Sequence, residues 1–185
     1  MFQRYEFMLV CILSDSHDNL KLLAAAVADA KQRGAEAVLH CGDVVAPSTL
    51  KVTREFELPV HVIHGNNTGD QYALHRMSEK SGGQIFYYGQ DAGINLGGKK
   101  IFIVHYPHYA EAMAVTGDWD MVCCGHDHKH NVQWYDNIKN TKTVLVNPGT
   151  VAGIGAPPTY ILADLDKMEF EIIELDKTDM LKTAS

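Results

Sequence analysis

Side chains that can bind metal ions follow five apolar segments of this 185-residue sequence, each at the point where the segment ends. In parallel α/β sheets the carboxyl ends of the strands share one edge, and ligands bind in the crevice at that edge. If the five segments are strands, residues far apart in the sequence meet in one site. They are two carboxylates, one amide and four imidazoles: Asp15, His17, Asp43, Asn66, His105, His126 and His128.

This ligand set mixes oxygen and nitrogen donors and contains no thiolate. Such a mixture suits Mn, Fe, Co, Ni or Zn, whereas an all-oxygen set indicates Mg or Ca. Seven ligands are too many for one ion, but two ions about 3.5–4 Å apart that share a carboxylate use seven side chains. Asp43 is the expected bridge because it stands alone at its strand end.

The formal charge of such a site indicates the substrate. Two divalent ions contribute about +4, which Asp15 and Asp43 reduce to about +2. The site would therefore be cationic, although the formal charge of the chain is −7. A phosphate ester is the expected small anionic substrate, because two metal ions stabilise both the attacking and the leaving oxygen and activate water.

The remaining histidines need separate interpretations. A single histidine at a strand end more often satisfies structural hydrogen bonds than binds a metal. We expect His64 and His108 to contact the ligands or the substrate. A cysteine-containing zinc site at 123–128 is the competing interpretation, and it is disfavoured because the sequence has no second cysteine pair. Four histidines outside the ordered set are expected to be structural: His40, His61, His75 and His130.

The first half of the chain alternates short apolar segments with amphipathic ones. This pattern predicts strands joined by helices and therefore a parallel sheet covered on its faces. The expected strands are 8–13, 35–40 and 60–64, and the expected helices are 19–33, 48–56 and 71–80. Asp18 and Asn19 are candidate caps of the first helix.

The second half is richer in predicted strands. A hairpin turn is expected at Gly97-Gly98 and a helix at 109–115. The expected strands are 85–88, 93–96, 100–104, 121–124, 131–135, 143–146, 160–164 and 170–174. No repeat or linker divides the sequence, so we predict one α/β domain over 1–185, with a core at about 8–175 and a frayed tail at 176–185.

Composition excludes several classes of protein. Hydrophobic residues are 46% and charged residues 21%, as in ordinary globular proteins. The negative net charge argues against stable binding of nucleic acid or of an anionic membrane. The apolar run 7–13 is too short to span a bilayer and lacks a cleavage site after it, and four cysteines do not form a secreted disulfide framework. We therefore expect a cytoplasmic protein.

The ordered set resembles the motifs of the calcineurin-like metallophosphoesterase superfamily, in particular its small bacterial and archaeal phosphodiesterase branch. The motifs are Asp-x-His at Asp15, Gly-Asp at Gly42, Gly-Asn at Gly65, a separate His105, and Gly-His-x-His at Gly125. Each dipeptide is weak alone, but the order of the whole set is specific. The resemblance implies a four-layer αββα sandwich with a binuclear metal site at one edge.

The resemblance spans roughly 8–165 and includes a turn motif at 147–150. It implies that phosphodiesters or phosphomonoesters are hydrolysed by a metal-activated water, with Mn as the first choice of metal, and it allows a homodimer or higher oligomer. The catalytic centre would be Asp43, Asn66 and His105. By analogy one ion is held by Asp15, His17 and His128, the other by Asn66, His105 and His126, and both by Asp43.

The chain departs from the family pattern after the Gly-Asn motif. The pattern commonly continues with His or Cys and then an acidic residue, and this histidine is a candidate proton donor to the leaving group. Here Asn67 and Thr68 follow, and an amide cannot act as that acid. We therefore expect activated leaving groups, or a proton from metal-bound water, His64 or His108. Asp70 is a candidate for the missing carboxylate.

Two classes of function fit the sequence. The first is the metal-dependent phosphoesterase, whose physiological target could also be a nucleotide or a phosphoprotein. The second is a protein-binding scaffold on the same fold, similar to the retromer subunit that resembles phosphoesterases but lacks parts of the ligand set. All seven ligand positions are filled here, which favours the enzyme.

Overall fold

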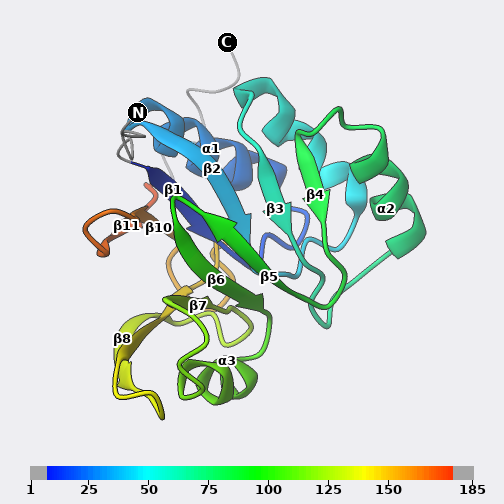
Figure 1. Ribbon diagram of the computed structural model, residues 1–185. Helices are drawn as coiled ribbons and strands as arrows, with labels where there is room; N and C mark the ends of the chain where they lie inside the picture. Colours follow the sequence, from blue (N-terminus) through cyan, green and yellow to red (C-terminus); the bar gives the residue numbers. More distant parts are fainter. Residues whose placement is uncertain (1–7, 177–185) are drawn as a thin grey trace, which may run out of the picture.

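The computed structural model describes residues 8–176 and consists of two β-sheets packed face to face, with helices on both outer sides (Figure 1). The first sheet has six strands in the order β11-β10-β1-β2-β3-β4. Its strands β1 to β4 pair in parallel, whereas β10 and β11 are antiparallel additions. Their bounds are β1 Leu9–Leu13, β2 Ala35–His40, β3 Val60–Val62, β4 Ile85–Tyr87, β10 Thr159–Asp164 and β11 Glu169–Glu174.

The second sheet has five strands in the order β5-β6-β7-β9-β8. The central strands β6, β7 and β9 are parallel, and β5 and β8 pair antiparallel at the two edges. The bounds are β5 Asp91–Leu96, β6 Lys99–Val104, β7 Met121–Cys123, β8 His130–Asp136 and β9 Lys142–Pro148. Both sheets therefore have a parallel centre, and each has its own C-terminal edge.

Helices cover the outer face of each sheet. The helices α1 (Leu20–Gln32) and α2 (Gln71–Glu79) and the 3₁₀ helix η1 (Pro47–Phe56) lie with the first sheet, and α3 (Pro107–Ala114) lies with the second. The resulting order of layers is helix, sheet, sheet, helix. The αββα sandwich expected from the sequence is therefore confirmed.

The core divides into three apolar layers that match this architecture. Val10 and Ile12 of β1 belong to the layer between the sheets, whereas Cys11 and Leu13 belong to the layer beneath the first set of helices. A third, smaller layer packs α3 on the second sheet. Because β1 is buried on both faces, its sequence is a continuous apolar run and shows no alternation.

Most predicted elements are confirmed, with one difference in type. The helix expected at 48–56 is a 3₁₀ helix, Pro47–Phe56. Thr49, Val52 and Thr53 are β-branched and disfavour the α-helical backbone, and the Thr53 hydroxyl donates to the carbonyl of Leu50. The predicted hairpin turn joins β5 to β6, with Gly97 and Gly98 both at positive φ, as a type I′ turn requires.

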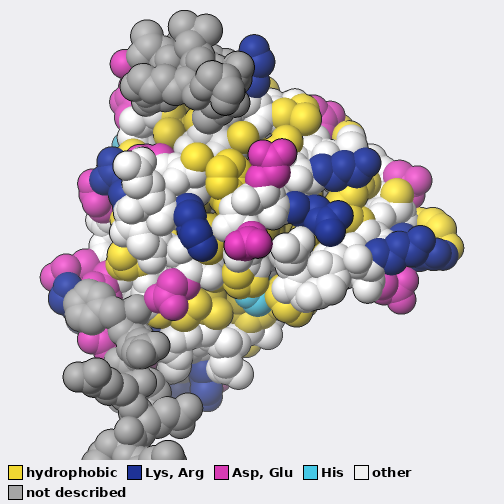
Figure 2. Space-filling view, turned by 90° about the horizontal axis from the view of Figure 1, so that it is seen from above, with side chains coloured by type: hydrophobic (Ala, Val, Ile, Leu, Met, Phe, Trp, Pro, Cys, Tyr) yellow, Lys and Arg dark blue, Asp and Glu magenta, His cyan; other side chains and the backbone are white. Residues whose placement is uncertain are grey.

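Figure 2 shows the face seen from above Figure 1, where Lys and Arg side chains alternate with Asp and Glu and form no continuous basic patch. Within residues 8–176 we find no helix with both the length and the apolar character needed to cross a membrane. All predicted tail residues except Asp176 lie outside the described residues.

Candidate metal centre

The loops that carry the predicted ligands leave the C-terminal ends of strands from both sheets and meet at one edge, toward which the arrowheads of β2 and β3 point in Figure 1. Backbone hydrogen bonds join the loops after β1 and β2, from Asp15 N to Gly42 O and from His17 N to Asp43 O, both at 3.0 Å. The backbone N–H of His126, after β7, donates to Asp15 Oδ2 at 3.0 Å and links the second sheet to the first.

These loops have an unusual backbone conformation. Non-glycine residues rarely adopt positive φ, because the side chain then crowds its own backbone. Such strained residues cluster at functional sites, where the surrounding structure holds them in place. Five of the seven predicted ligands have φ between 40° and 76°: Asp15, His17, Asp43, His126 and His128.

The first group of ligand atoms combines Asp15, His17 and His128. Asp15 Oδ1 is buried, lacks a hydrogen-bond partner, and lies 3.3 Å from His128 Nε2 and 3.7 Å from His17 Nε2. The two imidazole nitrogens are 3.3 Å apart. The Nδ1 of His128 lies 2.8 Å from the carbonyl of Ile154, to which it must donate, so a neutral His128 keeps its Nε2 lone pair for a metal. The group fits a divalent cation.

The second group combines Asn66, His105 and His126. Asn66 Oδ1 lies 3.1 Å from His105 Nε2 and 2.8 Å from His126 Nδ1. His105 is buried, and its Nδ1 donates to the carbonyl of Cys41 at 2.8 Å, which leaves Nε2 for a metal. An amide oxygen between two imidazole nitrogens is a donor set that suits a borderline divalent ion.

Asp43 lies between the two groups. Its Oδ2 is 3.7 Å from His17 Nε2, and its Oδ1 is 3.3 Å from His105 Nε2. Burial alone would raise the pKa of the Asp43 carboxyl, but its contact with the His105 imidazole and the hydrogen bonds from Asn67 outweigh burial and hold this pKa below its usual range. Asp43 is therefore an ionised carboxylate within reach of both groups, as a bridging ligand must be.

Close approach explains why glycine precedes three of the ligands. A Cβ at Gly65 would lie 2.1 Å from Asp43 Oδ1, and a Cβ at Gly42 would lie 2.5 Å from His105 Nδ1. At Gly125 it would lie 2.0 Å from the hydroxyl oxygen of Ser14. Since a real Cβ does not approach other atoms so closely, the ligand loops pack against each other only with glycine at these positions.

Comparison with known proteins agrees with this geometry. The family model described as the calcineurin-like phosphoesterase superfamily domain matches residues 8–168. The chain belongs to this superfamily. A curated relative, "Phosphodiesterase MJ0936" of Methanocaldococcus jannaschii, is 27% identical over 172 residues, which cover 91% of this chain and 100% of the relative.

Several solved structures share the fold. A structure described as a novel archaeal phosphodiesterase has a TM-score of 0.82 and 26% identity, and the match covers 91% of this chain and 100% of that chain. The Escherichia coli phosphoesterase YfcE has a TM-score of 0.62 and 17% identity, with coverage of 91% and 100%. Vps29 of Cryptosporidium parvum has a TM-score of 0.58 and 18% identity, with coverage of 91% and 97%. At these identities the last two show the fold alone.

Asn67, which stands where the chain departs from the superfamily pattern, holds the Asp43 carboxylate by two hydrogen bonds. The backbone N–H of Asn67 donates to Asp43 Oδ1 at 2.8 Å, and the Asn67 side chain donates to Oδ2 at 2.7 Å. Asp70, considered as a replacement carboxylate, instead caps α2 by accepting a hydrogen bond from the backbone N–H of Ala73 at 2.8 Å. Asn67 thus holds a ligand rather than donating a proton.

Neither of the two proton-donor candidates, His64 and His108, makes a hydrogen bond to the seven predicted ligands within residues 8–176. The Nδ1 of His64 is 2.6 Å from the hydroxyl of Tyr87, and burial, reinforced by His105, lowers the pKa of His64. His108 is exposed and contacts the ring of Tyr109, with centroids 4.3 Å apart. Both roles stay predictions.

Support by Asn147 and by backbone carbonyls was not predicted. The Asn147 side chain donates to Gly125 O at 3.1 Å and to Asp127 Oδ1 at 2.8 Å, so it braces the loop that carries His126 and His128. The turn motif containing Asn147 was a signal for this role. The carbonyls of Cys41 and Ile154, which orient two imidazoles, gave no signal because any residue offers a carbonyl.

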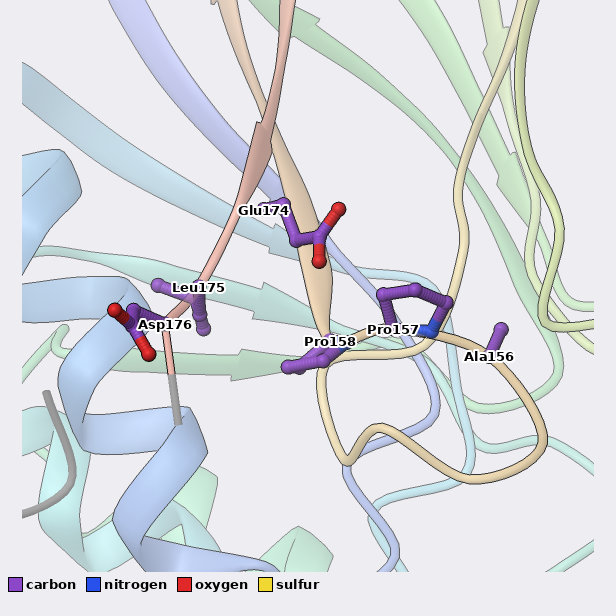
Figure 3. Close-up of a pocket in the computed structure, with 6 residues that line it drawn as sticks. All are labelled: Ala156, Pro157, Pro158, Glu174, Leu175 and Asp176. Carbon is purple, nitrogen blue, oxygen red and sulfur yellow. The ribbon is translucent and has the colours of Figure 1, made fainter. Parts of the chain in front are cut away.

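A second hollow lies outside this centre, between the loop before β10 and the end of β11 (Figure 3). The groove has a volume of about 520 Å³. Glu174 and Asp176 stand on its β11 side, and Pro157 and Pro158 on its loop side. With two carboxylates and no Lys, Arg or His among the described residues that line it, the groove does not suit a phosphate ester.

Proposed function

We propose that this protein is a phosphoesterase that uses two divalent metal ions. The observation that carries the proposal is the convergence of seven donor side chains from both sheets, with Asp43 within reach of both ligand groups. Asp15, His17 and His128 would hold one ion, Asn66, His105 and His126 the other, and Asp43 both.

When bound, such ions neutralise the charge of a phosphate ester and lower the pKa of water toward neutrality. The chain's own residues hold and orient the centre. The carbonyls of Cys41 and Ile154 fix the tautomers of His105 and His128, and Asn67 fixes the Asp43 carboxylate. Supports of this kind keep the ligand atoms in place through the reaction.

We propose phosphodiesters as the first substrates to test, because the relative from M. jannaschii is named a phosphodiesterase. The donor set of oxygen and nitrogen without sulfur suits Mn, Fe, Co, Ni or Zn, and Mn is our first choice. The four cysteines are free and buried, which agrees with the expected cytoplasmic setting. A homodimer or higher oligomer is part of the same expectation.

The test is hydrolysis of bis(4-nitrophenyl) phosphate and 4-nitrophenyl phosphate by protein loaded with Mn, Ni or Zn. We expect Asp43→Asn and His126→Ala to lower kcat/KM by about a thousandfold or more, because each removes a ligand. His75→Ala is the matched control, since this exposed histidine lies on α2. Full activity in either ligand variant would refute the mechanism.

The scaffold hypothesis makes a different forecast for the same protein. The likeness to Vps29 concerns the fold, and the complete ligand set favours the enzyme. Metal content decides between them: we expect about two ions per chain after reconstitution. Fewer than about one ion per chain, together with no turnover, would favour the scaffold.

A further inference from the structure

A small cavity adjoins the second ligand group. It has a volume of about 180 Å³ and is lined by His64, Gly65, Gln90, His105 and Tyr106. His105 is thus both a wall of the cavity and a candidate ligand, and Gly65 directly precedes Asn66. A cavity of about 150 Å³ can hold benzene, so this one has room for about one planar ring.

The wall formed by Tyr106 is aromatic and held in place. Tyr106 lies between β6 and α3, where its carbonyl accepts hydrogen bonds from the N–H groups of Tyr109 and Ala110, both at 3.1 Å. Its ring centroid is 4.9 Å from that of His126 and 5.3 Å from that of His105, in edge-to-face geometry. The ring is therefore positioned before a substrate arrives.

The charge of the cavity restricts what it can bind. No Lys or Arg is among the lining residues within 8–176, so this part of the chain offers no partner there for a second phosphate group. The Nδ1 of His64 is engaged by the Tyr87 hydroxyl at 2.6 Å. Gln90 contributes an amide, which can donate and accept hydrogen bonds at the polar edge of a ring.

We propose that this cavity binds a planar aromatic ring carried by one ester substituent of the substrate, and that Tyr106 determines this specificity. The proposal rests on the proposed phosphoesterase function, because the phosphate group must sit at the ligand cluster for the substituent to reach the cavity. Both an aryl ester and a nucleoside carry such a ring. Contacts between aromatic rings favour this substituent over a saturated one of equal size.

The test compares two diester analogues that differ only in ring type, methyl phenylphosphonate and methyl cyclohexylphosphonate. Their dissociation constants are measured by calorimetry on the full chain loaded with Mn. We expect the phenyl compound to bind about 3- to 10-fold more tightly. Tyr106→Leu should bring the ratio close to one, Tyr106→Phe should keep it, and Tyr72→Leu, at an exposed tyrosine on α2, should leave it unchanged.

The outcomes separate the two proposals. Equal binding of both compounds to the unmodified protein overturns the aromatic cavity and leaves the phosphoesterase function intact. If neither compound binds to protein that contains Mn, both the aromatic cavity and the phosphoesterase function are overturned. If Tyr106→Leu is folded by circular dichroism and still binds the phenyl compound more tightly than the cyclohexyl compound by the same ratio, Tyr106 does not determine the specificity.

A second arm identifies the source of the ring. Thymidin-5′-yl methylphosphonate is likewise a singly charged phosphonate monoester, but it carries a nucleoside on its ester oxygen instead of a phenyl group on phosphorus. Tighter binding than the phenyl compound, reduced in Gln90→Ala, would support a nucleoside, because the amide of Gln90 can bond to the base edge. Weaker binding than the phenyl compound would support an aryl ester.

Discussion

His40 shows how a buried side chain can support the metal loops without binding a metal. It is 1% exposed and ends β2, three positions before Asp43. The backbone N–H of Gly42 donates to its Nδ1 at 3.3 Å, so the proton of the neutral ring is on Nε2, 2.9 Å from the Ser16 hydroxyl. Burial, the main cause, lowers the pKa of His40 to about 3.

This shift predicts a loss of stability in acid. An unfolded chain protonates His40 below about pH 6.5, but the folded chain does so only near pH 3. The free energy of unfolding should therefore fall as the pH falls from about 6 to 4, with a contribution from His40 that approaches about 1.4 kcal/mol per pH unit. Urea unfolding in EDTA measures this slope, which should be reduced in His40→Gln and unchanged in His75→Gln. Equal slopes in His40→Gln and the unmodified chain would contradict the assignment.

At this scale the sequence predicts the types of the ligands better than their supports. Asp15, Asn66 and His105 were predicted to be ligands because their side chains have metal-binding chemistry and their order is specific. The positive φ of Asp43 was not foreseen, since it results from contacts between loops from two sheets. The contact of Asn67 with Asp43 was missed for the same reason.

Among the elements, α2 depends on a cap at its start. Asp70 accepts a hydrogen bond from Ala73 N and satisfies one of the free N–H groups of the first turn. We expect Asp70→Ala to lower the free energy of unfolding by about 1 kcal/mol and Asp70→Ser to restore most of it. Chemical unfolding of the variants measures the effect, with Asp91→Ala, at an exposed position on β5, as the control.

The same variants test whether Asp70 has a catalytic role. As a cap, it should be replaceable by Ser or Ala with kcat/KM for bis(4-nitrophenyl) phosphate unchanged within about twofold. A large loss of kcat/KM in Asp70→Ser, without loss of stability, would instead support the missing carboxylate suggested by the family pattern.

Elements were predictable where periodicity or turn chemistry was strong. The buried strand β1 and the Gly97-Gly98 turn follow directly from an apolar run and two adjacent glycines. The 3₁₀ form of η1 could not be predicted. Apolar spacing over ten residues does not distinguish a 3₁₀ helix, whose hydrogen bonds join residues three apart, from an α-helix, whose hydrogen bonds join residues four apart. The division of the strands between two sheets was predicted only from the family resemblance, since strand order depends on contacts between distant segments.

For the whole molecule, the important feature is that both sheets supply candidate ligands. Asp15, His17, Asp43 and Asn66 follow strands of the six-stranded sheet, and His105, His126 and His128 follow strands of the five-stranded one. The first group joins Asp15 and His17 to His128, and the second joins Asn66 to His105 and His126. Ions at these positions would therefore bind the folded chain and not the unfolded one.

Metal loading should consequently stabilise the fold by mass action. Metal at a hundred times its dissociation constant contributes about 2.7 kcal/mol for one site, less any binding to the unfolded chain. We expect excess Mn to raise the midpoint of thermal unfolding and EDTA to reverse the rise. In Asp43→Asn most of the shift should disappear, because the shared ligand is lost, whereas His75→Asn should keep it. Equal midpoints in Mn and EDTA, or a full shift in Asp43→Asn, would contradict a metal centre shared between the sheets.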